Sequence, residues 1–420
     1  MTISPTLQHN IGTIPSHGLR RKAITLLAIL AVMSLSPTTV DFLIAAFLGA
    51  NIPLGTYAFF GYVILTLLLA LSGSANRAAT INSAILFILC LALAATSLWS
   101  PSTSYLATKL PLVVVTPTVL FLSGFMISSS GGAVDIGKSV IGFGLVILLG
   151  IWIFGAETIV GFQVGLDDEF GGRYQSISRV LAVAVIACFT FFASNSSGWK
   201  RAFLLATSVM LALQILYSGG RVGFLILFIT IPIVTASLLR GRNMLLALAL
   251  WIALSLLFVY VLDLRAIAEM IWPTQMPLTI DRILMEFGDT SATQFQALQR
   301  NNLWLAAIEI WQENPLLGVG LAGFPIHAGF GDSLGVYPHN IILELAAETG
   351  LLGLALFVSF SLYCIFRGNF EGVPRIDRLV AIGVLASGLA ISSVISDFGL
   401  QRELFIGLGL ISGLKNRNFQ

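Results

Sequence analysis

Charged side chains are scarce in this sequence. They make up 10% of the residues, against about 25% in an ordinary soluble domain, while hydrophobic residues make up 57%. With so little charge, water cannot be the main solvent of the folded chain. The Lys and Arg residues form only short pairs beside apolar runs, and the lack of a basic cluster argues against nucleic acid as a partner.

Cysteines and processing signals are also few. Cys90, Cys188 and Cys364 lie inside apolar runs, where a thiol behaves as a small hydrophobic group, and their spacing offers neither a disulfide nor a zinc site. The basic residues at 20–22 precede an apolar run, but no small-residue cleavage site follows. We therefore expect an uncleaved first helix, preceded by a disordered cytoplasmic tail at 1–19.

What the sequence has in abundance is long apolar runs, from residue 24 to residue 414. Their lengths approach the about 20 residues that a helix needs to cross a hydrocarbon core of roughly 30 Å. A β-barrel would need apolar and polar residues at alternating positions, whereas the runs 202–216 and 244–262 are apolar at odd and even positions alike. Since helices satisfy their backbone groups locally in lipid, we expect an all-α, polytopic transmembrane helix bundle.

The runs predict about 12 spans. Nine lie in residues 20–263 and three in residues 339–420, which end in a short cytoplasmic tail. Pro37 and Asp41 interrupt the first span, which could be two half-helices. The predicted spans are 23–46, 56–73, 80–98, 108–128, 138–156, 177–194, 199–217, 221–239, 243–263, 340–366, 377–396 and 400–414.

Basic residues divide unequally between the two ends of these spans. Fourteen of the 22 Lys and Arg residues fall on the side that holds both termini, and four of the other eight lie in the two longest loops. By the positive-inside rule, the basic side is cytoplasmic. The sequence thus predicts a multi-pass bacterial inner-membrane protein with both termini in the cytoplasm.

One connection, residues 264–338, is much longer than the others and is expected on the periplasmic side. Long ordered loops on a membrane scaffold usually carry function. Within this loop, Leu298, Trp304, Leu305, Ile308 and Trp311 form one apolar face of a predicted helix at 295–311, which suits a helix lying in the membrane interface.

Two residue types at the start of the tenth span could carry chemistry. His339 lies where a helix N-terminus disfavours the imidazolium form, so it could act as a general base, or it could simply cap the helix. Glu344 and Glu348 share one face of the same helix. A buried structural carboxylate is the simpler interpretation of Glu348, whereas Glu344, nearer the surface, could face substrate.

Two arginines are candidates for binding phosphate. Arg221 follows two glycines where the seventh span turns into the eighth, and Arg300 lies on or beside the loop helix. Guanidinium groups bind phosphate oxygens bidentately, so these two residues would suit a diphosphate. Arg221 could instead be a snorkelling arginine, and Arg300 could belong to a solvated helix face.

Two other patterns carry less weight. The glycines of 318–323 match G-x-G-x-x-G, but no strand precedes them and no crossover unit surrounds them, so dinucleotide binding is rejected. The acidic triplet at 167–169 could bind a divalent cation, but three adjacent carboxylates in a loop are usually just solvated. No metal site is expected.

Several of these residues fall into one ordered pattern. The chain reads N-P-L-L-G-V-G at 314–320, P-H-N at 338–340, L-E-L at 343–345 and E-T-G at 348–350. This block resembles the signature region of the O-antigen ligase and O-antigen polymerase superfamily. The resemblance extends to S-G-G-R at 218–221 and to Arg300 upstream of Leu303.

The resemblance implies a GT-C-like membrane glycosyltransferase that takes a glycan from undecaprenyl diphosphate at the periplasmic face, inverts C1 and needs no metal or other cofactor. By analogy, Arg221 and Arg300 would hold the diphosphate, and His339 would act as general base. The remaining substrate-binding candidates are Arg173, Asn340, Glu344, Gly318 and Gly320. Arg173 is the weakest of them, because its surroundings depart from the R-x-x-G…P-N pattern of many family members.

The acceptor, a glycan or lipid A-core, cannot be read from this signature. A ligase is our working hypothesis, and a polymerase of repeat units for O-antigen or exopolysaccharide is a close alternative. A secondary transporter would also need about twelve helices. However, the two halves show no repeat, and the candidate polar residues gather at one face around the long loop.

Overall fold

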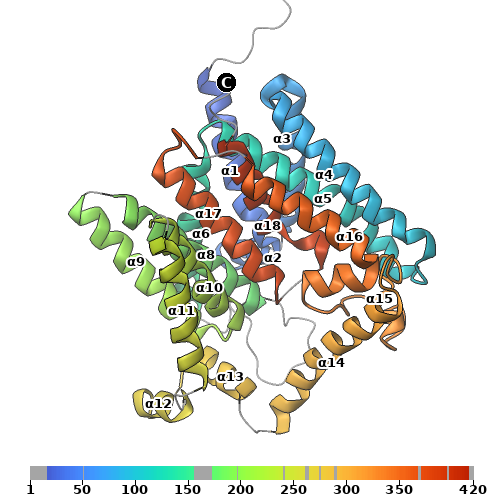
Figure 1. The fold of residues 1–420 in the computed structure, drawn as a ribbon. Coiled ribbons are helices and arrows are strands. Elements are labelled where there is room, and N and C mark those ends of the chain that lie inside the picture. The colour runs from blue at the N-terminus through green and yellow to red at the C-terminus, as the bar shows by residue number, and fades with distance from the viewer. Residues whose placement is uncertain are drawn as a thin grey trace, which may run out of the picture.

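The computed structural model describes residues 17–50, 52–155, 173–195, 197–239, 242–260, 264–273, 276–287, 291–367, 370–394 and 397–415. Over these ranges the chain forms helices joined by short turns, and no strand occurs in them (Figure 1). The expected all-α class is therefore confirmed. The acidic triplet at 167–169 lies outside the described residues.

Each of the twelve predicted spans contains at least one helix. In chain order they are α1 (His17–Leu35) with α2 (Pro37–Leu48), α3 (Leu54–Leu69), α4 (Arg77–Ala95), α5 (Ser104–Ser129), α6 (Ala133–Phe154), α8 (Arg173–Ser194), α9 (Gly198–Tyr217), α10 (Arg221–Ser237), α11 (Arg242–Tyr260), α16 (Ile341–Phe366), α17 (Arg375–Ser392) and α18 (Arg402–Lys415). Short turns η1 (Ala70–Ser74), η2 (Thr96–Trp99) and η4 (Phe398–Leu400) extend or precede some of them.

Not every helix has the length and composition of a full span. Among the described residues, seven helices meet both criteria, and the bent pair α1–α2 makes eight if it is one span. Helices α10 and α11 are shorter apolar helices. Helix α18 has only 14 residues, and α17 begins with three charged residues within four positions. The structure thus supports a polytopic bundle, with fewer full-length spans than the about 12 predicted.

The first predicted span is two helices at 93° to each other. The break lies at Ser36, where Pro37 opens α2 and cannot donate the hydrogen bond that would continue α1. Arg402 and Arg179 donate to the carbonyls of Ser34 and Leu35 at the end of α1, which replaces the backbone partners lost at the break. The half-helix alternative predicted from Pro37 is confirmed.

Helix α18 lies at the centre of the bundle and packs along α5 (Figure 1). The two backbones come very close, because a Cβ atom at Gly409 would lie 2.1 Å from the carbonyl oxygen of Phe121. Small residues allow such close approach between membrane helices, where dispersion contacts and not water exclusion hold helices together. This packing fixes α5, which carries part of the site described below.

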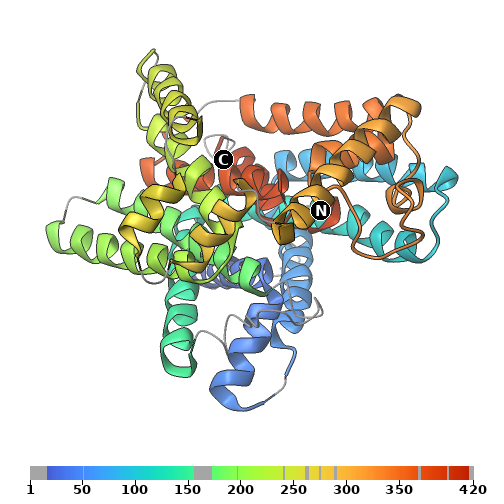
Figure 2. The same ribbon diagram turned by 90° about the horizontal axis from the view of Figure 1, so that it is seen from below.

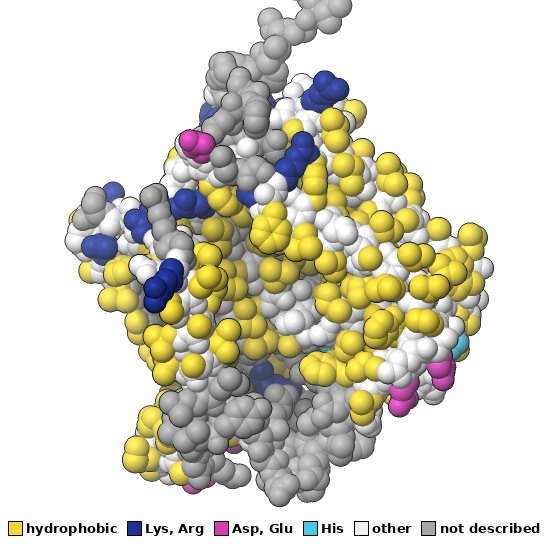
Figure 3. All heavy atoms as spheres, viewed as in Figure 1, with side chains coloured by type: hydrophobic (Ala, Val, Ile, Leu, Met, Phe, Trp, Pro, Cys, Tyr) yellow, Lys and Arg dark blue, Asp and Glu magenta, His cyan; other side chains and the backbone are white. Residues whose placement is uncertain are grey.

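Hydrophobic side chains cover the outside of the bundle. Ile88 is 65% exposed and Leu352 is 54% exposed, as expected where the surrounding solvent is lipid. Figure 3 shows a broad hydrophobic band with most of the visible Lys and Arg gathered above it and at its upper left. An ion pair between Arg21 and Asp135 (2.8 Å) joins α1 and α6 at this basic end.

Four further helices lie at the opposite end, which we call the loop end. They are α12 (Leu264–Ile271), α13 (Leu278–Phe287), α14 (Ser291–Glu313) and α15 (Phe324–His327), and Figure 2 views the bundle from this end. Helix α14 is longer than the predicted helix at 295–311. Its buried face consists of Leu303, Ala307 and Ile310, whereas Leu305 of the predicted apolar face is 57% exposed. The interfacial position of that face stays a prediction.

Candidate functional site at the loop end

The site is organised around the first turn of α16. Asn340 is the N-cap residue, and its Oδ1 accepts hydrogen bonds from the backbone N–H groups of Ile342 (3.0 Å) and Leu343 (3.2 Å). Its Nδ2 donates to the carbonyl of Ser393 (3.2 Å), just after α17. Asn340, predicted as a substrate-binding residue, therefore fixes the start of α16 against the end of α17.

His339 directly precedes this cap and is half-buried. Its φ angle of 55° lies in the left-handed region that non-glycine residues rarely adopt. Two contacts lie at this turn. The ring of Tyr337 lies 4.4 Å from the imidazole, centroid to centroid, and Trp304 Nε1 of α14 donates to the carbonyl of Pro338 (2.7 Å). The left-handed backbone position at this turn is therefore occupied by His339 and not by its neighbour, the N-cap residue Asn340.

Behind this turn, the glycine-rich segment lies against a break in α16. Gly350 has a φ angle of 66° and interrupts the helix. The N–H groups of Val319 and Gly320 donate to the carbonyls of Ala347 (3.0 Å) and Glu348 (2.9 Å), and the N–H of Leu351 donates to Pro315 (2.8 Å). The two sequence blocks of the signature are therefore partners in one backbone hydrogen-bond pattern.

The glycines of this segment are explained by close backbone contact. A Cβ at Gly318 would lie 2.4 Å from the carbonyl carbon of Glu348, and one at Gly320 would lie 2.6 Å from Cα of Ser100. Both residues also have positive φ angles. The structure assigns packing roles to Gly318 and Gly320, and their predicted contact with substrate stays a prediction.

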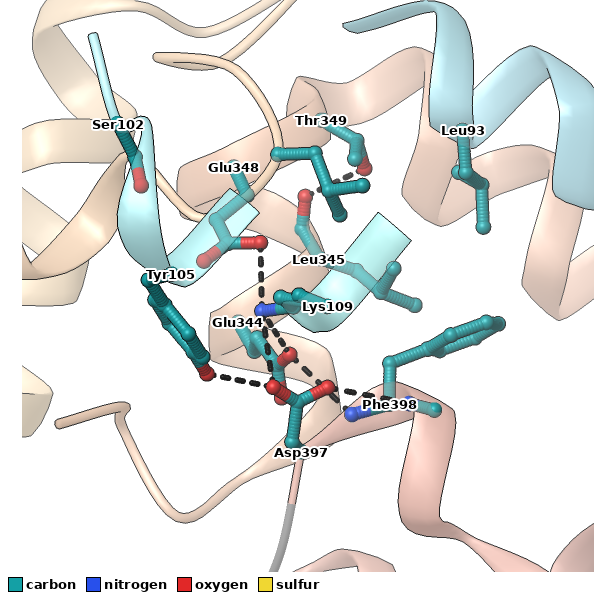
Figure 4. A network of polar contacts seen from close by, with 12 residues as sticks. Leu93, Ser102, Tyr105, Lys109, Glu344, Leu345, Glu348, Thr349, Asp397 and Phe398 are labelled. Carbon is teal, nitrogen blue, oxygen red and sulfur yellow. Dashed lines mark hydrogen bonds and ion pairs between the residues drawn. The ribbon is translucent and has the colours of Figure 1, made fainter. Parts of the chain in front are cut away.

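A buried cluster of charged side chains lies between α5, α16 and the segment before α18 (Figure 4). Lys109 Nζ is 2.6 Å from Glu344 Oε1, 2.8 Å from Glu348 Oε2 and 3.4 Å from Asp397 Oδ2. Tyr105, one turn before Lys109, donates its hydroxyl to Asp397. The side chains of Lys109, Glu344 and Glu348 are each at most 2% exposed.

This cluster bears on the two glutamates of α16. Glu348 pairs with a cation on another helix, which is the structural arrangement favoured from its depth. Glu344 also pairs with Lys109, and its Oε1 accepts from the backbone N–H of Phe398 (3.2 Å). Glu344 thus faces the interior in this structure, and the prediction that it contacts substrate would require it to leave these partners.

Lys109, Tyr105 and Asp397 were missed from the sequence. A signal was present for Lys109, the second residue of the predicted span 108–128, because a lysine in lipid is costly unless it has a partner. Its partners lie about 240 and 290 positions away in the chain, and nothing in the sequence of α5 identifies them.

Arg221 is the first residue of α10 and is half-buried at the loop end. Gly219 before it has a φ angle of 76°. Ser178 of α8 donates to the carbonyl of Gly220 (2.7 Å) and accepts from the N–H of Gly223 (3.0 Å). The glycines let α8 approach this closely, so the turn that carries Arg221 is held by α8.

The other two arginines can be placed only by their helices. Arg300 lies in α14 and Arg173 opens α8, but both side chains lie outside the described residues. Helix α14 packs against α13 and α16, and α13 is tied to α9 by a hydrogen bond from Thr279 to the carbonyl of Ile215 (2.7 Å). The helices that carry Arg221 and Arg300, and the turn that carries His339, therefore lie toward the same end of the bundle (Figure 1).

The loop between α15 and α16 is anchored through Asp332. Its carboxylate accepts from Ser102 Oγ (2.6 Å) and from the backbone N–H groups of Thr103 (2.9 Å) and Ser104 (2.6 Å) at the start of α5. These hydrogen bonds favour the charged form and hold the pKa of Asp332 well below its ordinary value. The same helix thus contacts the loop at its first turn and α16 through Lys109.

The described residues hold no group of three or more His, Cys, Asp or Glu side chains arranged for a metal ion. His327, the other histidine of the loop, lies exposed in α15.

Residues 206–358 match a family model described as O-antigen ligase. The match runs from α9 to α16, so it includes Arg221, Arg300 and His339 and leaves out Lys109 and Asp397. The resemblance noted in the sequence is thereby confirmed. No curated protein and no solved structure matches the chain.

Proposed function

Since residues 206–358 are similar to the O-antigen ligase family, we propose that this protein moves a glycan from undecaprenyl diphosphate to an acceptor hydroxyl at the periplasmic face of the inner membrane. The family supports glycan transfer of the ligase or polymerase type by a multi-pass bacterial membrane protein. The donor lipid, the acceptor and the sidedness are parts of the proposal.

The distribution of charge supports the sidedness. Basic residues gather at one end of the bundle, where Lys415 at the end of α18 donates to the carbonyl of Ile365 at the end of α16. By the positive-inside rule this end faces the cytoplasm. The loop end, with His339 and Arg221, then faces the periplasm.

The proposed reaction is a single displacement at the anomeric carbon. The acceptor oxygen attacks C1 of the first sugar, the bond between C1 and the diphosphate oxygen breaks, and undecaprenyl diphosphate leaves with the bonding electron pair. His339 takes the proton of the acceptor hydroxyl. Attack opposite to the leaving group inverts the configuration at C1.

In this scheme, two guanidinium groups compensate the charge that develops on the diphosphate. Arg221 and Arg300 would bind its oxygens bidentately, which supplies the positive charge that a metal ion supplies in other transferases. We therefore propose a metal-independent reaction.

The observation that carries the proposal is the placement of His339. It is the residue of the family signature that combines a titratable side chain, partial exposure and a strained backbone at the loop end. Strained backbone positions cluster at active sites, and they persist only where the surrounding structure holds them in place. Here Asn340 and Trp304 supply that support.

Analysis of glycans in a deletion strain tests the function. A ligase predicts loss of polymer attached to the acceptor, with long lipid-linked chains retained. Lipid-linked glycan reduced to single repeats would instead identify a polymerase, and unchanged glycans in both pools would contradict the whole proposal.

Complementation with variants tests the site. Arg221→Ala, Arg300→Ala and His339→Ala should each abolish transfer at normal membrane levels, and loss of a general base alone costs about 100- to 10,000-fold. Arg→Lys at either arginine should also fail, because lysine cannot form the bidentate contact. His327→Ala, on the exposed α15, is the matched control and should keep activity. Substantial activity in all three alanine variants would contradict the proposed site.

A further inference from the structure

The first two turns of α16 form a distinct structural unit. This unit, which we call the 341–349 segment, begins at the Asn340 cap and ends where Gly350 interrupts the helix. At Gly350 the backbone hydrogen bonds go to the glycine-rich segment instead of along α16. The 341–349 segment is therefore joined to the rest of α16 through a non-helical residue, and its other end carries His339.

Ion pairs from α5 hold this unit from the side. Lys109 Nζ lies 2.6 Å from Glu344 and 2.8 Å from Glu348, the two carboxylates that the segment turns inward (Figure 4). Asp397 adds a third carboxylate at 3.4 Å. One ammonium group thus contacts three carboxylates that come from two separate parts of the chain.

The balance of charge makes Lys109 the critical member. With all groups ionised, one positive charge faces three negative charges in a buried site. Tyr105 and the N–H of Phe398 donate hydrogen bonds to Asp397 and Glu344, and the backbone N–H of Ala322 stabilises the Glu348 carboxylate. Glu344 Oε2 is buried and accepts no hydrogen bond from the described residues. Without Lys109, Glu344 and Glu348 would repel each other and Asp397, and removal of one partner from a buried ion pair is strongly unfavourable.

From this geometry we infer that Lys109 is a positioning residue for His339. It fixes the 341–349 segment against α5 and so sets where the imidazole stands relative to the bound substrates. In this inference Lys109 acts through the 341–349 segment and not by contact with substrate. The inference rests on the proposed function, since it assigns a role in the same reaction.

A positioning role has a kinetic signature. Displacement of a catalytic group by about 1 Å can cost about 100-fold in rate, because the reacting atoms no longer reach their attack geometry. Donor binding depends on the arginines of other helices and should change little. We therefore expect Lys109→Met to lower kcat by about 10- to 100-fold with KM for the lipid-linked donor nearly unchanged.

The test uses the full-length protein in detergent with lipid-linked glycan as donor. The compensating variant Lys109→Met/Glu344→Gln/Glu348→Gln removes the repulsion and should recover kcat to within about 3-fold of wild type, since neutral replacement of a buried ionic group is often tolerated. Lys415→Met is the matched control. It removes a buried lysine that contacts the opposite end of the same helix, and its kcat should stay at the wild-type value.

Hydrogen exchange of the 341–349 amides gives a second readout that needs no catalysis. Exchange should be faster in Lys109→Met, return toward wild type in the compensating variant and stay unchanged in Lys415→Met. If Lys109→Met does not accumulate in the membrane, Lys109→Gln, which removes the positive charge but can still donate hydrogen bonds to the carboxylates, replaces it with a smaller expected loss of kcat.

The outcomes separate the two hypotheses. Wild-type kcat and wild-type exchange in Lys109→Met, or a compensating variant as poor as the single variant, would overturn the positioning role. A different result would overturn the proposed function: the wild-type protein folds but transfers no glycan, while the variants still differ from it in hydrogen exchange as expected.

Discussion

Gly320 donates its backbone N–H to the carbonyl of Glu348 at 2.9 Å, and Glu348 lies two residues before Gly350, where α16 is interrupted. This contact is one of several backbone hydrogen bonds that join the glycine-rich segment to α16, the helix that begins just after His339. The two blocks are separated by about 20 residues of loop in the sequence, yet each supplies the hydrogen-bond partners that the other lacks. Their order and spacing therefore have a structural cause that is independent of substrate.

This pairing predicts that Gly318 is intolerant of even the smallest side chain. In Gly318→Ala, the added Cβ would meet the backbone of Glu348 at 2.4 Å, at a φ angle of 65°. Left-handed strain and overpacking together should lower the free energy of unfolding by about 2–4 kcal/mol. The thermal midpoint in detergent measures the loss.

The control for this prediction is Gly49→Ala. Gly49 has nearly the same φ angle, 63°, but a Cβ there meets nothing within 4 Å. It should cost only the conformational strain, about 1–2 kcal/mol. Equal losses in the two variants would show that close backbone contact at Gly318 is unimportant.

The fold was predictable from the sequence to a defined extent. Apolar runs identify helices because lipid leaves the backbone no other partner, and each of the twelve predicted segments is helical. The number of full spans was less predictable. Helix α18 has only 14 residues and lies inside the bundle, where its neighbours and not the bilayer thickness determine its length.

The site residues, too, were only partly predictable from the sequence. His339, Asn340 and Arg221 were identifiable because each lies at a helix start and within a sequence signature. The Lys109 cluster was not, since its members come from α5, α16 and the start of η4, and long-range pairing leaves no periodic signal in any one segment. The face of α14 was assigned incompletely because the helix has apolar residues on two sides, and packing on α16 selects the one with Ala307.

The anchor at Asp332 should make stability depend on pH. Its pKa is lowered in the folded state by the Ser102 hydroxyl and by three backbone N–H groups at the start of α5. The carboxylate therefore stabilises the fold fully above its ordinary pKa of 3.8, and this contribution is lost as the pH falls toward the lower pKa of the folded state. Asp332→Asn should lower the thermal midpoint at neutral pH, and the difference from wild type should shrink in acid.

Glu309→Gln provides the comparison for this variant. Glu309 is an exposed carboxylate on α14, and its neutralisation should leave the midpoint nearly unchanged at either pH. A constant difference between wild type and Asp332→Asn from neutral pH down to about pH 3 would contradict the role of the charged form.

The bend between α1 and α2 predicts a structural role for Arg402. Its guanidinium donates to the carbonyl of Ser34 and stacks over Phe59, with a centroid distance of 5.3 Å. Arg402→Met keeps most of the volume but removes the donor to a buried carbonyl, so stability should fall by about 2–3 kcal/mol. Arg201→Met is matched, because Arg201 also stacks on a phenylalanine and donates to a carbonyl, but is exposed.

The loss in Arg201→Met should stay within about 0.5 kcal/mol. Thermal midpoints of Arg402→Met and Arg201→Met, measured in the same detergent, compare the two losses of stability. If both variants lose the same amount, the carbonyls at the end of α1 do not depend on Arg402 for their partner.

The support of His339 by Trp304 gives a last prediction, on activity. Trp304 Nε1 donates to the carbonyl of Pro338, so it holds the peptide group directly before the strained histidine. Trp304→Phe keeps an aromatic ring and removes only this donor. If the proposed reaction is correct, kcat should fall about 2- to 10-fold, the equivalent of one hydrogen bond, with KM for the donor nearly unchanged.

Trp311 on the same helix supplies the matched control, because its Nε1 also donates to a proline carbonyl, that of Pro315, at 3.2 Å. That carbonyl keeps its hydrogen bond from Leu351 when the indole is lost. Trp311→Phe should therefore leave kcat at the wild-type value. A fall in kcat of the same size in both variants would mean that α14 acts through general packing, and the specific hold of Trp304 on the backbone before His339 would have to be abandoned.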